Sequence, residues 1–308
     1  MGQTLFGRYA SLTFGVPGKQ GRLIESISTD DDGNLVDGLR LQFKIEKTSE
    51  PSPNKAEIKI YNLNPDSINE LHKKGSVVVL EVGYYSNLDD NAPVSELIFK
   101  GDLMKIETTK NGSDYVTTLE TGDGAAAYAA SNFNGSFAPG ANIADVAQQV
   151  MSSFTGQSTS APEGVQGQFL NGATLSGSSK DVMDQIAGKT GTEWSIQDSR
   201  VQMIPVNGFT KLPVIVLQSL GTDPETGDPI NTGLIGSPNL SGFSHSLDKK
   251  GVGIEFKSLL NPGLKPGRRV KIESKNARVN GNFVVKKVTH NGDTRQGPWY
   301  SECEGVQY

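Results

Sequence analysis

The chain has very little cysteine and no long apolar run, and both absences restrict what it can be. Cys303 is the only cysteine among 308 residues, so the sequence predicts neither a disulfide framework nor a cysteine-based metal site. The longest apolar runs, such as Val77–Leu80 and Pro213–Leu217, have four or five residues. A helix that spans a bilayer needs roughly 20, so we expect no membrane insertion.

A concentration of positive charge is also missing. The net charge is −5 and the pI about 5.4, and the densest basic group is spread over a turn and the start of a strand: Lys265, Arg268, Arg269 and Lys271. A nucleic-acid footprint needs a denser patch. We therefore interpret these residues as a solvated edge or a subunit contact. The first 18 residues lack the basic and then apolar pattern of a signal peptide, so we expect none.

Patterns that carry catalysis or ligand binding are incomplete. Gly188-Lys189-Thr190 is like the end of a phosphate-binding loop, but Met183 stands where that loop needs its first glycine. Residues 30–34 match a calcium loop at three positions and lack its glycine and final glutamate, which favours a hairpin tip. His72, His245 and His290 have no metal-ligand spacing. We predict no catalytic, cofactor-binding or metal-binding residue, no cofactor and no enzymatic activity.

The sequence does contain many strand patterns. Residues 251–293 hold three of them, with apolar side chains at every second position, as is typical of a half-buried antiparallel sheet. Turn residues separate or follow these strands at Asn261-Pro262-Gly263, Pro266-Gly267, Asn280-Gly281 and Asn291-Gly292.

The first third of the chain is also rich in strands. Leu39, Leu41, Phe43 and Ile45 alternate with polar residues, and further strands are predicted over 58–60, 77–84, 97–106 and 115–121. One helix is predicted over 65–73. Asn64 is a suitable N-cap for it, Pro65 suits the first helical position, and Gly75 ends it.

The composition changes after residue 122. Residues 122–141 are small and predict a linker or extended arm, and the polar residues 155–178 predict a long exposed loop. Between and after them the patterns predict two helices and two short strands, over 141–153, 179–189, 193–196 and 200–204. Ser178 and Asp181 form a plausible capping box for the second helix.

The last hundred residues are again β. Val214–Leu217 predicts a buried strand, and residues 221–233 predict a long polar loop. The expected fold class is mainly β (α+β), with β domains at 1–122 and 207–308 that flank a small α/β domain at 123–206. The sequence shows no residue-level repeat between the two β domains.

The order and spacing of short blocks along nearly the whole chain resemble the baseplate hub proteins of contractile-tailed bacteriophages, the late-control-D-like family. In the first β domain these blocks are Asn54-Lys55-Ala56-Glu57-Ile58, Tyr61-Asn62-Leu63, Gly83-Tyr84, Ile98-Phe99-Lys100-Gly101-Asp102-Leu103, Thr118-Leu119-Glu120 and Asp123-Gly124. In the second they are Gly233-Leu234-Ile235-Gly236-Ser237-Pro238, Leu259-Leu260-Asn261-Pro262, Pro266-Gly267, His290-Asn291-Gly292-Asp293 and Trp299. The loop at 221–233 departs from the family pattern.

The resemblance implies a structural role. It implies two tail-tube-like antiparallel β-barrel domains in one chain, and a homotrimer whose ring of six barrel positions adapts the sixfold tail tube to the threefold spike. The expected partners are the spike protein, the tube protein, the tape-measure protein and the baseplate wedge, with DNA only passing through the lumen. The expected location is the tail baseplate of the virion, assembled in the cytoplasm of a bacterial host. The family has no catalytic residues to carry over.

One strand is a candidate for the contact between subunits. It is the apolar run at 77–82, with the candidate interface residues Val77, Val78, Val79, Leu80 and Val82. Two other functions stay open at this point: a tail-associated cell-wall or polysaccharide hydrolase, and a receptor-binding module at the tail tip.

Overall fold

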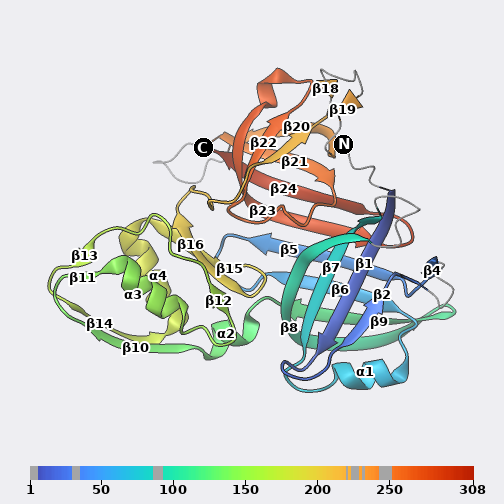
Figure 1. Cartoon of the computed structure of the whole chain (residues 1–308), viewed down its shortest axis with the longest axis horizontal. Coiled ribbons are helices and arrows are strands. Elements are labelled where there is room, and N and C mark those ends of the chain that lie inside the picture. Colours follow the sequence, from blue (N-terminus) through green and yellow to red (C-terminus); the bar gives the residue numbers. More distant parts are fainter. Residues whose placement is uncertain are drawn as a thin grey trace.

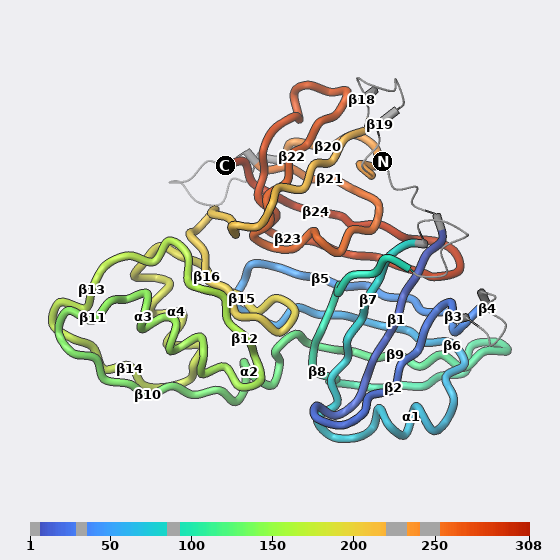
Figure 2. The backbone as a smooth tube through the Cα atoms, viewed as in Figure 1, coloured from blue at the N-terminus to red at the C-terminus, as the bar shows by residue number. Residues whose placement is uncertain are grey.

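The structure is a computed structural model that describes the chain except for residues 1–5, 30–34, 86–92, 220, 223–228, 231–232 and 243–251. We call residues 6–122, 123–206 and 207–308 the N-terminal, middle and C-terminal segments (Figures 1 and 2). The N-terminal segment contains β1 (Phe6–Gly15), β2 (Arg22–Glu25), β3 (Ile27–Thr29), β4 (Leu35–Asp37), β5 (Leu41–Thr48), β6 (Lys55–Tyr61), α1 (Pro65–Leu71), β7 (Val77–Tyr85), β8 (Val94–Asn111) and β9 (Asp114–Gly122).

The middle segment mixes helices and short strands. Its elements are α2 (Ala125–Ala130), β10 (Asn132–Phe137), β11 (Ala141–Asn142), α3 (Ile143–Met151), β12 (Ser158–Thr159), β13 (Gln168–Phe169), β14 (Ala173–Ser178), α4 (Ser179–Thr190), β15 (Thr192–Ile196) and β16 (Arg200–Pro205). The C-terminal segment contains β17 (Ile215–Gln218), β18 (Gly221–Thr222), β19 (Pro229–Ile230), β20 (Leu234–Gly242), β21 (Val252–Leu259), β22 (Arg269–Glu273), the 3₁₀ helix η1 (Ala277–Val279), β23 (Gly281–Asp293) and β24 (Trp299–Gln307).

One large sheet joins the N-terminal and C-terminal segments, which confirms the mainly β prediction. Its strand order is β2-β1-β7-β8-β9-β6-β5-β23-β24-β21-β20, with β22 also paired to β23 and β17 to β22. In the N-terminal segment β1, β2 and β7 form a front layer and β5, β6 and β9 a back layer, as Figure 1 shows. The long strand β8 links the layers, because its first half pairs with β7 and its second half with β9.

The two β segments repeat one strand arrangement. The order β7-β8-β9-β6-β5 in the first corresponds to β22-β23-β24-β21-β20 in the second. The outer neighbours differ, because β1 runs antiparallel to β7 whereas β17 runs parallel to β22. The sequence alone does not show this duplication, so the fold preserves a repeat that residue identity has lost.

A shared irregularity fixes how the two repeats align. The pairing of β8 with β9 shifts between Leu103 and Lys105, and that of β23 with β24 shifts between Val285 and Lys287. The residues after the two bulges make equivalent ion pairs, Lys105 with Glu120 at 3.3 Å and Lys287 with Glu304 at 2.8 Å. Bulges bend a strand and increase its twist, so each repeat bends its long strand at the same place.

The hydrophobic residues form three clusters. One lies within the N-terminal segment and also contains Leu260 and Trp299, one lies within the middle segment, and one within the C-terminal segment. Trp299 reaches from β24 into the first cluster and contacts Phe43 edge-on, with ring centroids 5.6 Å apart. The predicted domain boundaries after residues 122 and 206 stay a prediction, and these contacts tie the two β segments closely together.

The helix signals in the sequence are confirmed. The side chain of Asn64 accepts a hydrogen bond from the Ser67 amide at the start of α1, and that of Ser178 accepts one from Asp181 at the start of α4. Helix α4 ends at Gly191, whose φ of 65° lies in the left-handed region that glycine favours. Gly188-Lys189-Thr190 therefore closes a helix, in agreement with the helix predicted over 179–189.

Two predictions for the middle segment were wrong. Residues 122–141 are not a linker, because α2 and β10 form there, and residues 155–178 are not one long loop, because β14 pairs with β10. Tertiary contacts order both stretches. The Tyr128 ring stacks on Trp194 at 5.6 Å, and the sequence-distant pairing of β10 with β14 supplies the backbone hydrogen bonds that a local reading cannot see.

One further expectation was wrong, and two others lie wholly or partly outside the described residues. Val214–Leu217 is not a buried strand, since Val214 and Val216 are exposed. The predicted loop at 221–233 lies partly outside the described residues, and its ends pair as β18 and β19. Residues 30–34, expected as a hairpin tip, also lie outside the described residues, between the paired strands β3 and β4.

Asn291-Gly292 is not a turn. Both residues lie inside β23, where they pair with Lys44 and Phe43 of β5. A Cβ atom on Gly292 would lie 2.1 Å from the Phe43 ring, so glycine is present here because a ring packs flat against its backbone. The dipeptide predicts a turn from local preference, but the packing of Phe43 decides its conformation.

This contact generates a stability prediction. We expect Gly292→Ala to lower the free energy of unfolding by about 1–3 kcal/mol, because Phe43 is buried and must move. The matched control is Gly188→Ala in α4, where an added Cβ meets no atom within 4 Å, and we expect it to stabilise by about 0.5–1 kcal/mol. Urea unfolding measures both, and equal effects of the two substitutions would contradict the packing argument.

Candidate functional site

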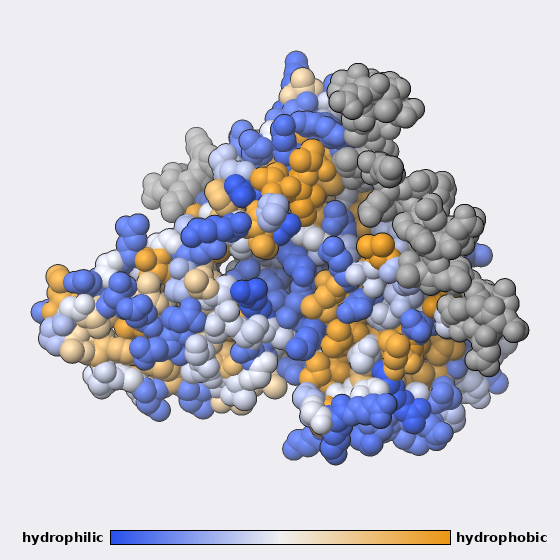
Figure 3. Space-filling model, in the orientation of Figure 1, coloured by the Kyte–Doolittle hydropathy of each residue, from blue (hydrophilic) through white to orange (hydrophobic). Residues whose placement is uncertain are grey.

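The structure places the predicted interface strand inside the sheet. Strand β7 lies between β1 and β8. Val78, Leu80 and Val82 are buried in the N-terminal core, whereas Val77 and Val79 are half-buried on the outward face. Figure 3 shows hydrophobic surface over this part of the N-terminal segment. The role of β7 as a subunit interface stays a prediction, and only its outward face is available for it.

The other candidate positions are dispersed. His72 is the exposed C-cap of α1, His290 is buried in β23, and His245 lies outside the described residues. Within the basic group, Lys271 is exposed and pairs with Glu273, whereas two other members make contacts within the chain. Lys265 binds Asp198 of the middle segment at 2.7 Å, and Arg269 donates to the Leu212 carbonyl at 3.0 Å. Lys265 and Arg269 therefore serve contacts within the chain.

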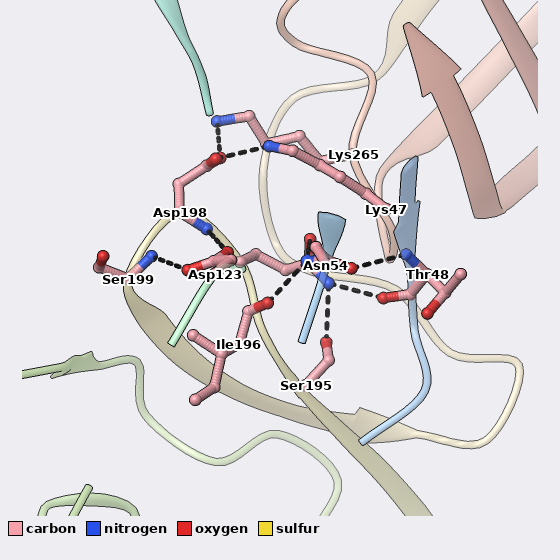
Figure 4. Close-up of polar contacts among 10 residues, drawn as sticks. Lys47, Thr48, Asn54, Asp123, Ser195, Ile196, Asp198, Ser199 and Lys265 are labelled. Atoms are coloured by element: carbon pink, nitrogen blue, oxygen red, sulfur yellow. Dashed lines mark hydrogen bonds and ion pairs between the residues drawn. The ribbon is translucent and has the colours of Figure 1, made fainter. Parts of the chain in front are cut away.

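The structure instead brings together a buried polar cluster that sequence reasoning missed. All three segments contribute to this junction cluster (Figure 4). Lys47 of β5, whose side chain is fully buried, binds Asp198 at 2.5 Å, and Lys265 binds the second oxygen of the same carboxylate. Asp123 accepts backbone hydrogen bonds from Asp198 at 2.5 Å and Ser199 at 2.8 Å. One turn of the middle segment is thus held by side chains from both β segments and by the residue that follows β9.

Burial sets the charges of the junction cluster. Loss of water lowers the pKa of the Lys47 amine, and Asp198 opposes that shift. Burial would raise the pKa of Asp198, but Lys47 and Lys265 outweigh it and hold this pKa below its usual range. Burial and the neighbouring Asp198 raise the pKa of Asp123 to about 7. The firmly ionised anion of the cluster is therefore Asp198.

Asn54 extends the junction cluster along the backbone. Its side-chain amide donates to the Ile196 carbonyl at 2.8 Å and the Gln197 side chain at 2.9 Å, and its oxygen accepts from the Thr48 amide. Gln197 in turn donates to the Thr48 carbonyl at 2.8 Å. These bonds join the turn between β15 and β16 to the loop between β5 and β6, so the orientation of the middle segment is fixed by directional contacts.

A second polar cluster lies at the other end of the β5–β23 pairing. Asp293 receives two hydrogen bonds from Arg40, at 3.1 and 2.6 Å, and one from Gln42 at 2.6 Å. The backbone amides of Arg295 and Gln296 donate to it as well. Burial alone would raise the pKa of Asp293, but these donors lower it to about 2. The carboxylate is thus ionised at neutral pH and binds the two β segments together.

The bulge residue Lys286 makes a third set of contacts between the segments. Its backbone carbonyl accepts from the Ser49 amide at 3.1 Å, and its side chain pairs with Glu193 of β15. Before this bulge β23 pairs with β22, and after it the same edge pairs with β5. All three segments therefore meet where one strand changes its partner.

These contacts hold the three segments of the chain in place. His290 is buried with its Nδ1 2.8 Å from the Ser301 hydroxyl, and burial lowers its pKa to about 3. Among the described residues no group of three or more His, Cys, Asp or Glu side chains could hold a metal ion. Nor does this part of the chain contain a helix long and apolar enough to cross a membrane.

One signal in the sequence could have revealed Lys47. Leu41, Phe43 and Ile45 define the inward positions of β5, and Lys47 continues that phase. A lysine at an inward position needs a buried partner. The partner, Asp198, lies 151 residues away, and nothing in its own sequence context identifies it.

The first site prediction concerns Lys47. We expect Lys47→Met to lower the free energy of unfolding by about 3 kcal/mol, because Asp198 would keep only the partly exposed Lys265 as a partner. Lys59→Met is the matched control. Its ion pair with Glu57 lies on the surface, so we expect a change below about 0.5 kcal/mol. Chemical denaturation that finds Lys47→Met as stable as the wild type would refute a stabilising ion pair.

The second site prediction is a pH dependence at Asp293. Because its pKa of about 2 in the folded protein lies below the ordinary 3.8, its stabilisation is fully present above about pH 4 and disappears as the pH falls towards 2. We expect Asp293→Asn to cost roughly 2 kcal/mol at pH 7 and much less at pH 2.5. Urea unfolding at both pH values tests this, with the exposed Glu57→Gln as control. A cost that does not change with pH would contradict it.

Comparisons with known proteins identify the fold. No protein-family model and no curated protein sequence matches this chain. Among solved structures, the tail protein from Neisseria meningitidis MC58 has a TM-score of 0.61 at 11% identity, covering 98% of this chain and 97% of its own. The 43 kDa tail protein of prophage MuSo2 from Shewanella oneidensis has 0.56 at 10% identity, covering 96% of each chain.

A third similar structure comes from a secretion system. It is an E. coli component of the type VI secretion system, described as structurally similar to the T4 bacteriophage tail proteins gp27 and gp5. Its TM-score is 0.57 at 11% identity, covering 96% of this chain and 76% of its own. This chain therefore has, over nearly its whole length, the fold of phage tail proteins and of a type VI secretion component, as its resemblance to baseplate hub proteins predicts.

Proposed function

We propose that this chain is a structural hub of a phage tail baseplate. Three copies form a ring that adapts the sixfold tail tube to the threefold spike and continues the DNA channel. The observation that carries the proposal is the duplicated strand order, joined edge to edge by β5 and β23. A chain with two equivalent β units needs three copies to present six of them, so a trimer matches both symmetries.

The rigid junction suits a mechanical role. The junction cluster and the Asp293 cluster fix the β segments at both ends of their shared pairing. A ring that transmits force between tube and spike needs subunits that do not hinge, and buried directional contacts resist hinging. In this proposal residues 1–122 and 207–308 are the two tube-like domains and residues 123–206 a peripheral domain.

The proposed partners follow from the position in the tail. The ring binds the spike protein on one side and the tube protein on the other, with the tape-measure protein and the baseplate wedge as further contacts. DNA passes through without specific binding, which a net charge of −5 favours. The protein assembles in the cytoplasm of a bacterial host, acts in the virion and has no enzymatic activity. The outward face of β7, with Val77 and Val79, contributes to the contact between subunits.

The proposal predicts a trimer. We expect light scattering on the purified chain, alone or mixed with its spike protein, to give three copies, and electron microscopy of the particle to show threefold density between tube and spike. Val79→Asp should reduce the trimer while the circular dichroism spectrum stays native, because Val79 is half-buried on the outward face. Val78→Asp is the matched control and should unfold the chain, since Val78 is buried in the core.

Each possible outcome tests a different part of the proposal. A chain that stays monomeric even with the spike would count against the hub. A normal trimer from Val79→Asp would remove the β7 face from the interface and leave the hub intact. Clearing of a peptidoglycan gel by the purified chain would favour the hydrolase instead.

A further inference from the structure

Among the strand edges that have no partner within the described residues are those of β20 and of the second half of β8. Strand β20 pairs only with β21, and the second half of β8, from Met104 to Asn111, pairs on one side only, with β9. The strand repeat indicates which strands these two edges correspond to. By strand order β20 corresponds to β5, and the second half of β8 corresponds to the part of β23 after its bulge. In the other repeat those two corresponding edges pair with each other.

The repeat also aligns individual residues. Across β5, β6 and β9 the residues Ile45, Ala56 and Thr121 form one row, and across β20, β21 and β24 the corresponding row is Leu240, Ile254 and Gly305. Thr121 and Gly305 are equivalent because each lies opposite the residue just before a bulge. Leu240 therefore occupies the place of Ile45.

The same reasoning locates the position opposite Leu240. His290 faces Ser301 across β23 and β24, and Thr108 faces Thr117 across β8 and β9. Counted from the two bulges, Thr108 occupies the place of His290. Since Ile45 pairs with His290 in the chain, the equivalent pair would be Leu240 with Thr108.

The exposure of Leu240 and Met104 supports the idea that a partner strand is missing at this edge. Ile45 and His290 are both fully buried, whereas Leu240 is 46% exposed. Met104, the bulge residue that corresponds to Lys286, is 66% exposed. Exposed apolar side chains on a sheet edge promote association. In the other repeat, the positions equivalent to Leu240 and Met104 lie where β5 and β23 pair with each other.

One copy cannot make this pairing with itself. In Figure 1 β20 lies near the top of the molecule, and β8 and β9 lie at the bottom, on the far side of β5 and β23. Because each copy of the chain carries both matching edges, the occupant that fits them is a second copy of the chain. Because the two edges are different surfaces, the contact is heterologous, and such contacts close into rings when the rotation allows it.

We propose that β20 of one copy pairs antiparallel with the second half of β8 of the next copy, with Leu240 opposite Thr108. The proposal rests on the proposed trimer and names the strands that close it. The contact between copies repeats the β5–β23 contact within each copy. A ring of three copies then has six equivalent junctions, three inside chains and three between them.

A simpler reading is that both edges are only protected against association. Lys105 and Lys110 on β8 and Pro238 on β20 are residues that commonly protect an edge. The lysines are compatible with pairing, however. Lys287 corresponds to Lys105 and lies within the β5–β23 pairing. Pro238 precedes the stretch from Asn239 to Gly242 that aligns with β5.

The test is a disulfide between copies. Residues opposite each other in antiparallel strands have Cα atoms about 4.5–5.5 Å apart, within the range that a disulfide spans. We expect the double variant Thr108→Cys with Leu240→Cys to give covalent dimers and trimers on a non-reducing gel after mild oxidation, and no longer ladder. The native Cys303 is buried and present in every variant, so it sets a common background.

Three controls distinguish the pairing from random collision. Thr108→Cys alone and Leu240→Cys alone should give at least tenfold less cross-linked product, because the contact brings two different positions together. The mispaired variant Thr108→Cys with Leu23→Cys uses a residue on the β2 edge that is even more exposed than Leu240 and should stay at the background level.

Light scattering on the same reduced samples separates this inference from the proposed function. A trimer without the specific cross-link overturns the β20–β8 pairing and leaves the hub proposal standing. A chain that never associates, alone or with the spike, overturns both. A trimer with cross-links confined to the Thr108–Leu240 variant supports both.

Discussion

The pairing of β5 with β23 is the interaction on which the rest of this structure depends. It runs from Thr48 opposite Lys287 to Gln42 opposite Asp293 and makes one sheet out of two repeats. Trp299 packs against Phe43 across this boundary, and Gly292 provides the room that the Phe43 ring needs. Without the pairing, each β segment would expose a strand edge and part of its apolar core.

The polar clusters at the two ends of this pairing do a different task from the apolar contacts. Apolar side chains can pack favourably in many relative orientations of the two segments. The ion pairs of Lys47 with Asp198 and of Arg40 with Asp293 form in only one such orientation. Buried ion pairs add little net stability over apolar residues of the same shape, but a broken pair is costly. We therefore interpret these clusters as contacts that set the angle between the segments, which the proposed ring would have to control.

The sequence predicts the local features of this fold well and its long-range features poorly. Alternation identifies β5 and β21, and caps identify α1 and α4, because each signal lies within a few residues. Asn291-Gly292 and residues 122–141 were misread because partners far along the chain decide their conformation. The junction cluster was missed for the same reason. Lys47 carries a local signal, but Asp198 and Lys265 become relevant only when the fold brings them together.

The repeat explains why equivalent positions carry different residues. Ile45 and His290 meet inside one chain, so neither is exposed once the chain has folded. Under the proposed pairing Leu240 and Thr108 meet only after two copies associate. Both side chains are therefore exposed to solvent in the unassembled chain. Thr108 is polar, and its hydroxyl lies 3.1 Å from that of Thr117. This hydrogen bond is present both before and after the proposed pairing. An edge that pairs between chains must balance attraction to its partner against aggregation, and a mixed row of one aliphatic and one hydroxyl side chain meets both demands.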